Sequence, residues 1–147
     1  MRIDLDYFRQ LLDVFLEAET AHITYIDMKN AGVEIYEDEE NEIIDQKFLF
    51  HLQLLIDNKL ISTYDMTCGS LKDFGISMYL DGEVGMCDVD IRLTQAGHDF
   101  ASSLHNKEVI EKLKSELKDM PFKVIFEGGQ KLLQHYAKKK LDALLAE

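Results

Sequence analysis

The chain lacks long apolar runs. Its longest ones span only a few residues, such as 48–50 and 54–56, whereas a membrane-spanning helix needs about 20. The opening residues Met1, Arg2, Ile3 and Asp4 do not begin the apolar core of a signal peptide. We therefore predict a cytoplasmic protein with no membrane contact. With 147 residues, 46% of them apolar, the chain is long enough for one domain with a real core, with or without a helical extension.

Cysteine is also scarce, and the short motifs of catalytic and metal sites are missing. Cys68 and Cys87 form no C-x-x-C, and in a cytosolic chain we predict free thiols rather than a disulfide. The sequence contains neither H-E-x-x-H nor G-x-S-x-G. The segment Gly128-Gly129-Gln130-Lys131 is too short for a phosphate-binding loop and does not follow a strand. We predict no enzymatic activity and no cofactor.

Basic residues are few in most of the chain. Residues 1–100 hold seven Lys/Arg against twenty-one Asp/Glu, a net charge of −14. Residues 101–147 hold nine against seven, a net charge of +2. Because an acidic body repels phosphate at long range, this distribution counts against general nucleic-acid binding.

Amphipathic helices are the clearest positive signal in the first half of the chain. Apolar residues recur at helical spacing over residues 5–19, behind Asp4 or Asp6 as the cap. Next, Thr24 is expected to cap a short helix ending at Gly32, with a short strand over 23–26 as the alternative. Asp45 then caps a strongly apolar helix ending near Asn58-Lys59.

Between these helices, residues 34–45 carry seven acids and no base. Like charges at this density destabilise a helix interior, so we predict a solvated loop. A surface facing a partner and a calcium loop are the alternatives. The calcium loop is the weakest, since no glycine is present to make its sharp turn.

An extended region follows and leads into a capped helix. Residues 60–67 and 74–80 are strand-like, and Asp81-Gly82 predicts a tight hairpin. A further strand over 89–93 stops at Thr94, a good N-cap for a helix carrying Phe100. A strand passing directly into a capped helix is typical of a winged-helix domain, where the last strand of the wing returns to the body.

The last 40 residues predict two more amphipathic helices. Asn106 can cap the first, and Pro121 suits the first turn of the second. Gly128 and Gly129 fall inside the second helix, where each costs about 1 kcal/mol relative to alanine. We therefore expect either a bend at the glycines or close packing of another backbone against them.

Several blocks of sequence together carry a family resemblance. They are Asp6-Tyr-Phe-Arg-Gln-Leu-Leu, His51-Leu-Gln-Leu-Leu-Ile-Asp-Asn-Lys-Leu-Ile, Ile91-Arg-Leu-Thr-Gln-Ala-Gly-His-Asp-Phe, and Pro121-Phe-Lys-Val with the Lys-rich helix to Leu141. In these the chain resembles a family of small bacterial and prophage proteins, the domain-of-unknown-function family numbered two thousand five hundred and thirteen. It departs from that pattern in its acidic insert, its long wing, and Asn58-Lys59 where Ala-Gly is usual.

The resemblance implies an α+β fold but no established activity or ligand. We expect a winged-helix-like domain with a long β wing over residues 1–104, followed by C-terminal amphipathic helices over 105–147. The matching blocks contain five residues for which we expect structural roles, with His51 and His98 near each other. These residues are His51, Thr94, Gly97, His98 and Phe100.

Two functions remain open, and charge decides between them. A protein–protein interaction module, which includes self-association as a homodimer, agrees with the acidic body and the amphipathic tail. The alternative is a DNA-binding transcriptional regulator that uses residues 45–59, the wing and the tail. Its candidate DNA or partner contacts are Gln46, Lys47, Gln53, Lys59, Lys138, Lys139 and Lys140. We favour the interaction module because few bases are available for phosphate contacts; an acidic mimic of DNA ranks below both.

Overall fold

Five of the six helices begin where the sequence places a capping side chain. The structure, a computed structural model, describes residues 1–146. In it, Asp4, Thr24, Asp45, Thr94 and Asn106 each accept a hydrogen bond from the backbone N–H three residues on. Each cap satisfies a donor that the first turn of a helix leaves free. The predicted caps are therefore confirmed, and the segment after Thr24 is a short helix rather than a strand.

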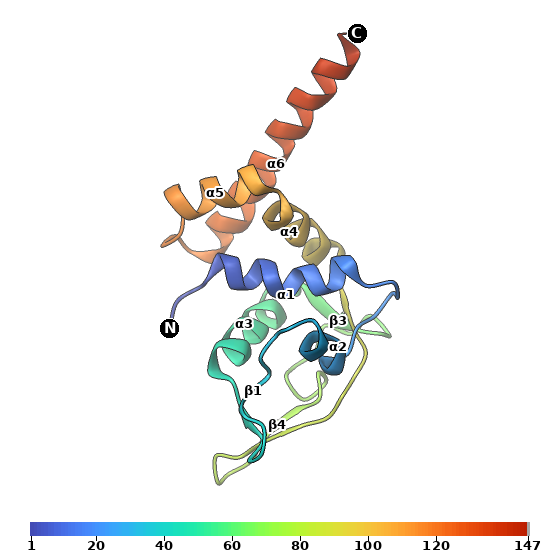
Figure 1. Ribbon diagram of the computed structural model, residues 1–147, viewed down its shortest axis with the longest axis vertical. Helices are drawn as coiled ribbons and strands as arrows, with labels where there is room; N and C mark the ends of the chain where they lie inside the picture. The colour runs from blue at the N-terminus through green and yellow to red at the C-terminus, as the bar shows by residue number, and fades with distance from the viewer. Residues whose placement is uncertain (147) are drawn as a thin grey trace.

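Helices and short strands give a mixed α/β protein, shown in Figure 1. The helices are α1 (Leu5–Glu17), α2 (Tyr25–Asn30), α3 (Gln46–Asp57), α4 (Gln95–His105), α5 (Lys107–Glu116) and α6 (Phe122–Leu145). The strands are β1 (Tyr36–Asp38), β2 (Ile43–Ile44), β3 (Ile61–Thr63), β4 (Ile76–Met78), β5 (Val84–Met86) and β6 (Ile91–Leu93).

Strand β6 lies at the centre of the fold. It pairs antiparallel with β3, so that Thr63 lies opposite Ile91. On the other side of Ile91, its N–H and C=O exchange two hydrogen bonds of 2.8 Å with the backbone of Ile23. Three backbone segments that are far apart in the sequence are therefore aligned at Ile91.

The acidic segment over residues 34–45 is a hairpin, and the predicted loop is wrong there. β1 pairs antiparallel with β2. The backbone N–H of Asp45 donates to Ile35 at 2.8 Å, and the side chains of Ile35 and Ile44 are buried. Charge repulsion argues against a helix, but it does not prevent a short hairpin that buries two isoleucines and leaves most of its acids in water.

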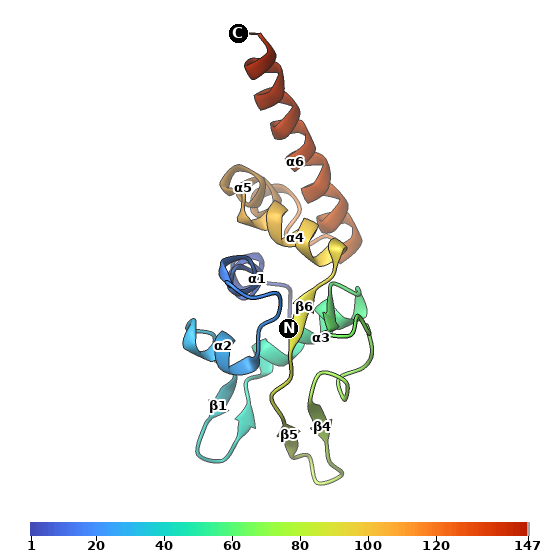
Figure 2. The ribbon, with the colours of Figure 1, turned by 90° about the vertical axis from the view of Figure 1, so that its right-hand side faces the viewer.

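The second hairpin is predicted correctly, although its strands are shorter than expected. β4 pairs with β5, and the N–H of Tyr79 donates to Glu83 at 2.9 Å across the Asp81-Gly82 turn. Gly82 has a φ of +86°, a conformation that suits glycine. Strand β3 ends at Thr63 because the chain closes a turn there, with the Thr63 N–H donating to Thr67. In Figure 2 both hairpins extend toward the end of the molecule opposite the C-terminus.

One buried apolar cluster joins the body to the C-terminal helices. Helix α4 packs chiefly against α1, α5 and α6. Phe8 of α1 meets Phe100 of α4 edge to face, with 5.7 Å between ring centroids. Residues 106–125 contribute Val109, Ile110, Leu113 and Ile125 to the same cluster.

Helix α6 runs unbroken through its two glycines, and side chains pack tightly against both. A Cβ on Gly129 would lie 3.1 Å from Ser103 Oγ, and one on Gly128 would lie 2.9 Å from Leu117 Cδ1. The close approach is thus made by side chains of α4 and of the segment after α5, rather than by a backbone. Beyond these contacts α6 leaves the body and projects away from it (Figure 1). No helix among residues 1–146 is long and apolar enough to cross a membrane.

Candidate functional site

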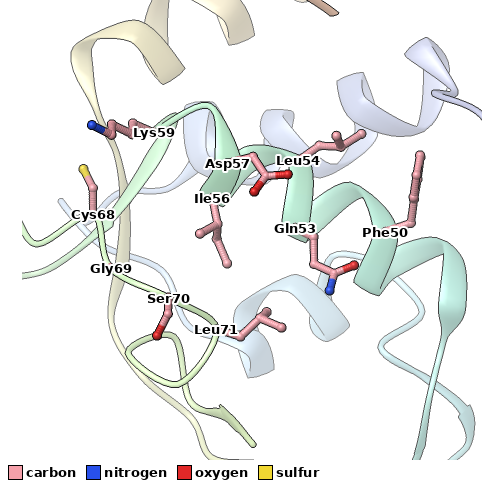
Figure 3. Close-up of a pocket in the computed structure, with 10 residues that line it drawn as sticks. All are labelled: Phe50, Gln53, Leu54, Ile56, Asp57, Lys59, Cys68, Gly69, Ser70 and Leu71. Carbon is pink, nitrogen blue, oxygen red and sulfur yellow. The ribbon is translucent and has the colours of Figure 1, made fainter. Parts of the chain in front are cut away.

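A groove beside α3 is the strongest candidate for a binding site. It has a volume of about 640 Å³ and lies between one side of α3 and the loop over residues 68–71. Figure 3 shows Gln53 and Ile56 pointing from α3 toward the loop that carries Ser70 and Leu71. The residues that line the groove are Phe50, Gln53, Leu54, Ile56, Asp57, Lys59, Cys68, Gly69, Ser70 and Leu71.

The groove exists because α3 is apolar on more than one face. One face is fully used by the core, with Phe48, Leu52 and Leu55 all 0% exposed. Phe50 and Leu54 stand outside that face and are only half-buried. An apolar surface wider than the core needs is available to another molecule.

Local turns hold the two walls of the groove. At the end of α3, Lys59 adopts a φ of +54° and turns the chain into β3. On the opposite wall, the Asp73 carboxylate accepts a hydrogen bond of 2.8 Å from the Ser70 N–H. Asp57 and Lys59 place one charge of each sign at the rim, and both are exposed. The arrangement therefore offers an apolar floor with a mixed polar rim.

The cysteines stay apart, as predicted, since both thiols are free in the structure. Cys68 is half-buried at the groove, and Cys87 is exposed after β5. Within residues 1–146, no group of three or more His, Cys, Asp or Glu side chains is arranged to hold a metal ion.

The four predicted contact residues near α3 do not form one surface. Gln53 and Lys59 both line the groove. Lys47 instead turns toward α1, where its Nζ lies 2.8 Å from the Asp4 carboxylate and 5.0 Å from the centre of the Tyr7 ring. Gln46 lies in a separate cleft between the two hairpins.

The three tail lysines lie far from this groove. Lys138, Lys139 and Lys140 are all exposed on α6, and Lys139 and Lys140 line a separate cleft with residues 106–108 at the start of α5. They share a stretch of helix with one another, but not with Gln53 and Lys59.

His51 and His98 have different surroundings, and α1 separates the helices that carry them (Figure 1). His51 is 0% exposed, and both of its ring nitrogens have backbone partners. Its Nδ1 lies 2.7 Å from the Lys47 carbonyl, and its Nε2 accepts the N–H of Asp4 at 3.1 Å. This pattern requires the neutral ring with its proton on Nδ1. Burial lowers the pKa of His51, whereas His98 is exposed on α4.

Thr94, Gly97 and Phe100 fasten α4 to the turn after α3. Thr94 Oγ1 donates to the Lys59 carbonyl at 2.7 Å and accepts the Gly97 N–H at 3.0 Å. A Cβ on Gly97 would lie 1.8 Å from the Leu60 carbonyl oxygen, so only glycine fits there. Phe100 then enters the core.

Sequence reasoning missed one wall of the groove and one polar contact. Nothing local marks residues 68–71 as neighbours of α3, since that contact depends on the path of the whole extended region. Asp4 was expected only as a cap, yet its backbone N–H also holds His51. The other wall did carry a signal, because Phe50 and Leu54 widen the apolar face of α3 beyond what one core contact needs.

No protein-family model, curated protein or solved structure matches this chain. The family resemblance seen in the sequence blocks therefore stays a prediction.

Proposed function

We propose that this protein is a winged-helix-like interaction module that binds a protein partner through the groove beside α3. The order of the elements supports the winged-helix part. A first helix is followed by a backbone bridge at Ile23, then α2 and α3, then β3, a hairpin region and β6. In a winged helix the same order ends with the last wing strand in the centre of a small sheet.

The observation that carries the proposal is the apolar character of the groove side of α3. In a DNA-binding winged helix the equivalent helix enters the major groove and presents Arg, Lys, Asn or Gln to base edges. Here α3 presents Phe50, Leu54 and Ile56, with Gln53 and Asp57 beside them. Apolar side chains at the centre and polar ones at the rim are typical of protein–protein interfaces.

The surroundings of α3 also favour a protein over DNA. A DNA-binding helix-turn-helix joins its two helices by a short turn, whereas the acidic β1–β2 hairpin lies between α2 and α3. Residues 1–100 carry a net charge of −14, so phosphates would be repelled from this face.

The second candidate function is DNA binding through the tail. Its support is the exposure of Lys138, Lys139 and Lys140 on α6, within residues 101–147, which carry a net charge of +2. Such binding would rest on phosphate contacts, so it would be independent of DNA sequence and would weaken steeply with salt.

Fluorescence anisotropy with generic duplex DNA separates the two functions. We expect no binding at low salt. Tight binding that disappears at moderate salt would overturn the interaction proposal and make Lys138, Lys139 and Lys140 the first residues to substitute.

Affinity capture from a lysate of the source cells, with chemical cross-linking, tests the groove itself. We expect a partner that wild-type protein retains and that Leu54→Asp loses. Ile26→Asp is the matched control, because Ile26 is 59% exposed on α2 and lies outside the groove. A partner retained equally by both variants would contradict the assignment to the groove.

A further inference from the structure

The C-terminal part of α6 has an apolar face that none of the other residues described by the structure covers. Leu141, Leu144 and Leu145 are 53%, 60% and 75% exposed. Leu133, Ala137, Leu141 and Leu145 follow at every fourth position, so they form one stripe along the helix. The stripe begins at the body, where Leu133 is half-buried, and continues to the end of the described helix.

A helix end of this kind is weak when it stands alone. Residues 137–146 are all exposed, and isolated helices shorter than about 12–15 residues are marginal in water. Packing of the amphipathic face supplies most of the stability of such helices in proteins. Covering the stripe would therefore stabilise the end of α6, which no other described residue packs against.

We propose that a second copy of this chain covers the stripe, with the two α6 helices packed antiparallel about a two-fold axis near residue 139. In this register Leu141 of each copy lies opposite Ala137 of the other, and Leu133 lies opposite Leu145. Leucine against alanine lets the two backbones approach closely at the centre. This pairing uses a different surface from the groove beside α3 and does not depend on the function proposed above.

Near Leu133, the surface beside α6 continues the stripe. The C-terminal end of the second copy's α6 would lie there. A cleft of about 670 Å³ lies between α6 and the start of α5, and its α6 side is lined by Leu133, Tyr136, Ala137, Lys139 and Lys140. In the antiparallel register, Leu145 of the second copy reaches this cleft. Lys107 lines the opposite wall, where its charge would meet the negative carboxyl end of the incoming helix.

The charges on the helix agree with the antiparallel arrangement. Lys138 and Asp142 are four residues apart on one edge of the stripe, so an antiparallel pair places Asp142 of one copy beside Lys138 of the other. In a parallel pair, Lys138 of one copy would instead lie at the same height as Lys138 of the other copy.

The arrangement also keeps the acidic bodies apart. At 1.5 Å per residue, Gly129 of each copy would lie about 15 Å from the axis, on opposite sides, and so about 30 Å from the other. Residues 1–100 of the two copies, which carry the net charge of −14, therefore lie on opposite sides of the axis. Parallel packing would place two bodies of strong negative charge side by side.

Sedimentation equilibrium on the full chain tests the pairing. We expect a reversible dimer for the wild type and at least a tenfold weaker association for Leu141→Glu, which places two carboxylates near the axis. Ala143→Glu is the matched control, since it adds the same charge on the opposite side of the same helical segment. A wild-type monomer at the highest soluble concentration, or equal weakening by both variants, would overturn the proposal.

Cross-linking tests the direction of the pair without depending on the stability of Leu141→Glu. In a Cys68→Ser, Cys87→Ser background, proteins carrying Ala137→Cys and Leu141→Cys are mixed and oxidised. We expect disulfides mainly between unlike copies. Disulfides mainly between like copies at position 141 would overturn the antiparallel arrangement.

The two proposals fail separately. Loss of dimer in Leu141→Glu with capture through Leu54 intact supports the tail pairing alone. If the wild-type monomer instead binds vesicles of anionic lipid through Leu141, the stripe belongs to a membrane surface and the second copy is excluded, while the groove proposal stands.

Discussion

The ring of His51 joins two helices through a backbone contact, since its Nε2 accepts the N–H of Asp4 at the start of α1, 3.1 Å away. The other ring nitrogen is held by the Lys47 carbonyl one turn earlier in α3. The rings of Tyr7 and Phe8 pack against it, with centroids 4.6 and 4.7 Å away. A protonated ring would lose the Asp4 bond and place a charge in this buried site.

Mild acid is therefore expected to destabilise the protein through His51. Because burial lowers the pKa of His51 in the fold, the unfolded chain binds the proton more readily. The contribution to stability is present above the ordinary pKa of about 6.5 and is lost as pH falls below it. Urea unfolding at a series of pH values between 7 and the range of carboxylate titration, roughly pH 4.5, measures this loss.

Two histidine variants identify the source of that pH dependence. His51→Leu should lower the free energy of unfolding by about 1–3 kcal/mol at pH 7, because it leaves the Asp4 N–H without its partner. It should also flatten the curve between pH 6.5 and 4.5. His98→Leu is the control, since His98 is exposed. A slope that His51→Leu leaves unchanged would exclude His51 as its cause.

Two glycines in helices should respond in opposite directions to alanine. At Gly97 the added Cβ would lie 1.8 Å from the Leu60 carbonyl oxygen, and a backbone atom cannot move aside. Gly97→Ala should therefore lower the free energy of unfolding by about 3 kcal/mol or more, as the most severe substitutions do.

Gly128→Ala is the matched comparison for Gly97→Ala. Its Cβ meets only the end of the Leu117 side chain, at 2.9 Å, which can rotate. Alanine gains up to about 1 kcal/mol of helix propensity, so we expect this variant to be neutral or slightly more stable. Thermal unfolding measures the change in stability of the two variants. A Gly97→Ala protein as stable as the wild type would contradict the tight contact between Gly97 and Leu60.

Thr94 is expected to contribute through two hydrogen bonds. Thr94→Val removes both the cap of α4 and the bond to the Lys59 carbonyl while keeping the shape, at a cost of about 1–2 kcal/mol. Thr94→Ser keeps the hydroxyl and should recover most of that loss. Equal stability of the Val and Ser variants in urea unfolding would show that the hydroxyl of Thr94 does not contribute to stability.

How far the sequence predicts this fold depends on whether the signal is local. Thr94 and Asp45 are recognisable as caps because the donors that they satisfy lie three residues away. We expected His51 and His98 to lie near each other, whereas α1 lies between the helices α3 and α4 that carry them. That arrangement depends on how Phe8 packs against both His51 and Phe100, and a linear sequence does not record such a contact.

In the candidate groove, too, one wall has a local signal in the sequence and the other does not. The excess apolar width of α3 is visible in the sequence at Phe50 and Leu54. The position of Leu71 on the other wall of the groove is set by the turn at Thr63 and the path of residues 64–75. Lys47 was misleading, because its helical position suggests an outward charge while Asp4 and Tyr7 hold it against α1.

Two tyrosines with buried hydroxyls should differ in what those hydroxyls contribute to stability. The hydroxyl of Tyr25 donates to the Phe74 carbonyl at 2.6 Å in a buried site, so Tyr25→Phe should cost about 1–2 kcal/mol and leave an acceptor unpaired. The hydroxyl of Tyr7 is buried without a hydrogen-bond partner among residues 1–146. Since a buried polar group without a partner is unfavourable, Tyr7→Phe should be neutral or raise stability by up to about 1 kcal/mol. Urea unfolding of the two variants measures the change in the free energy of unfolding for each. An equal loss of stability in both would indicate that the Tyr7 hydroxyl does have a hydrogen-bond partner in solution.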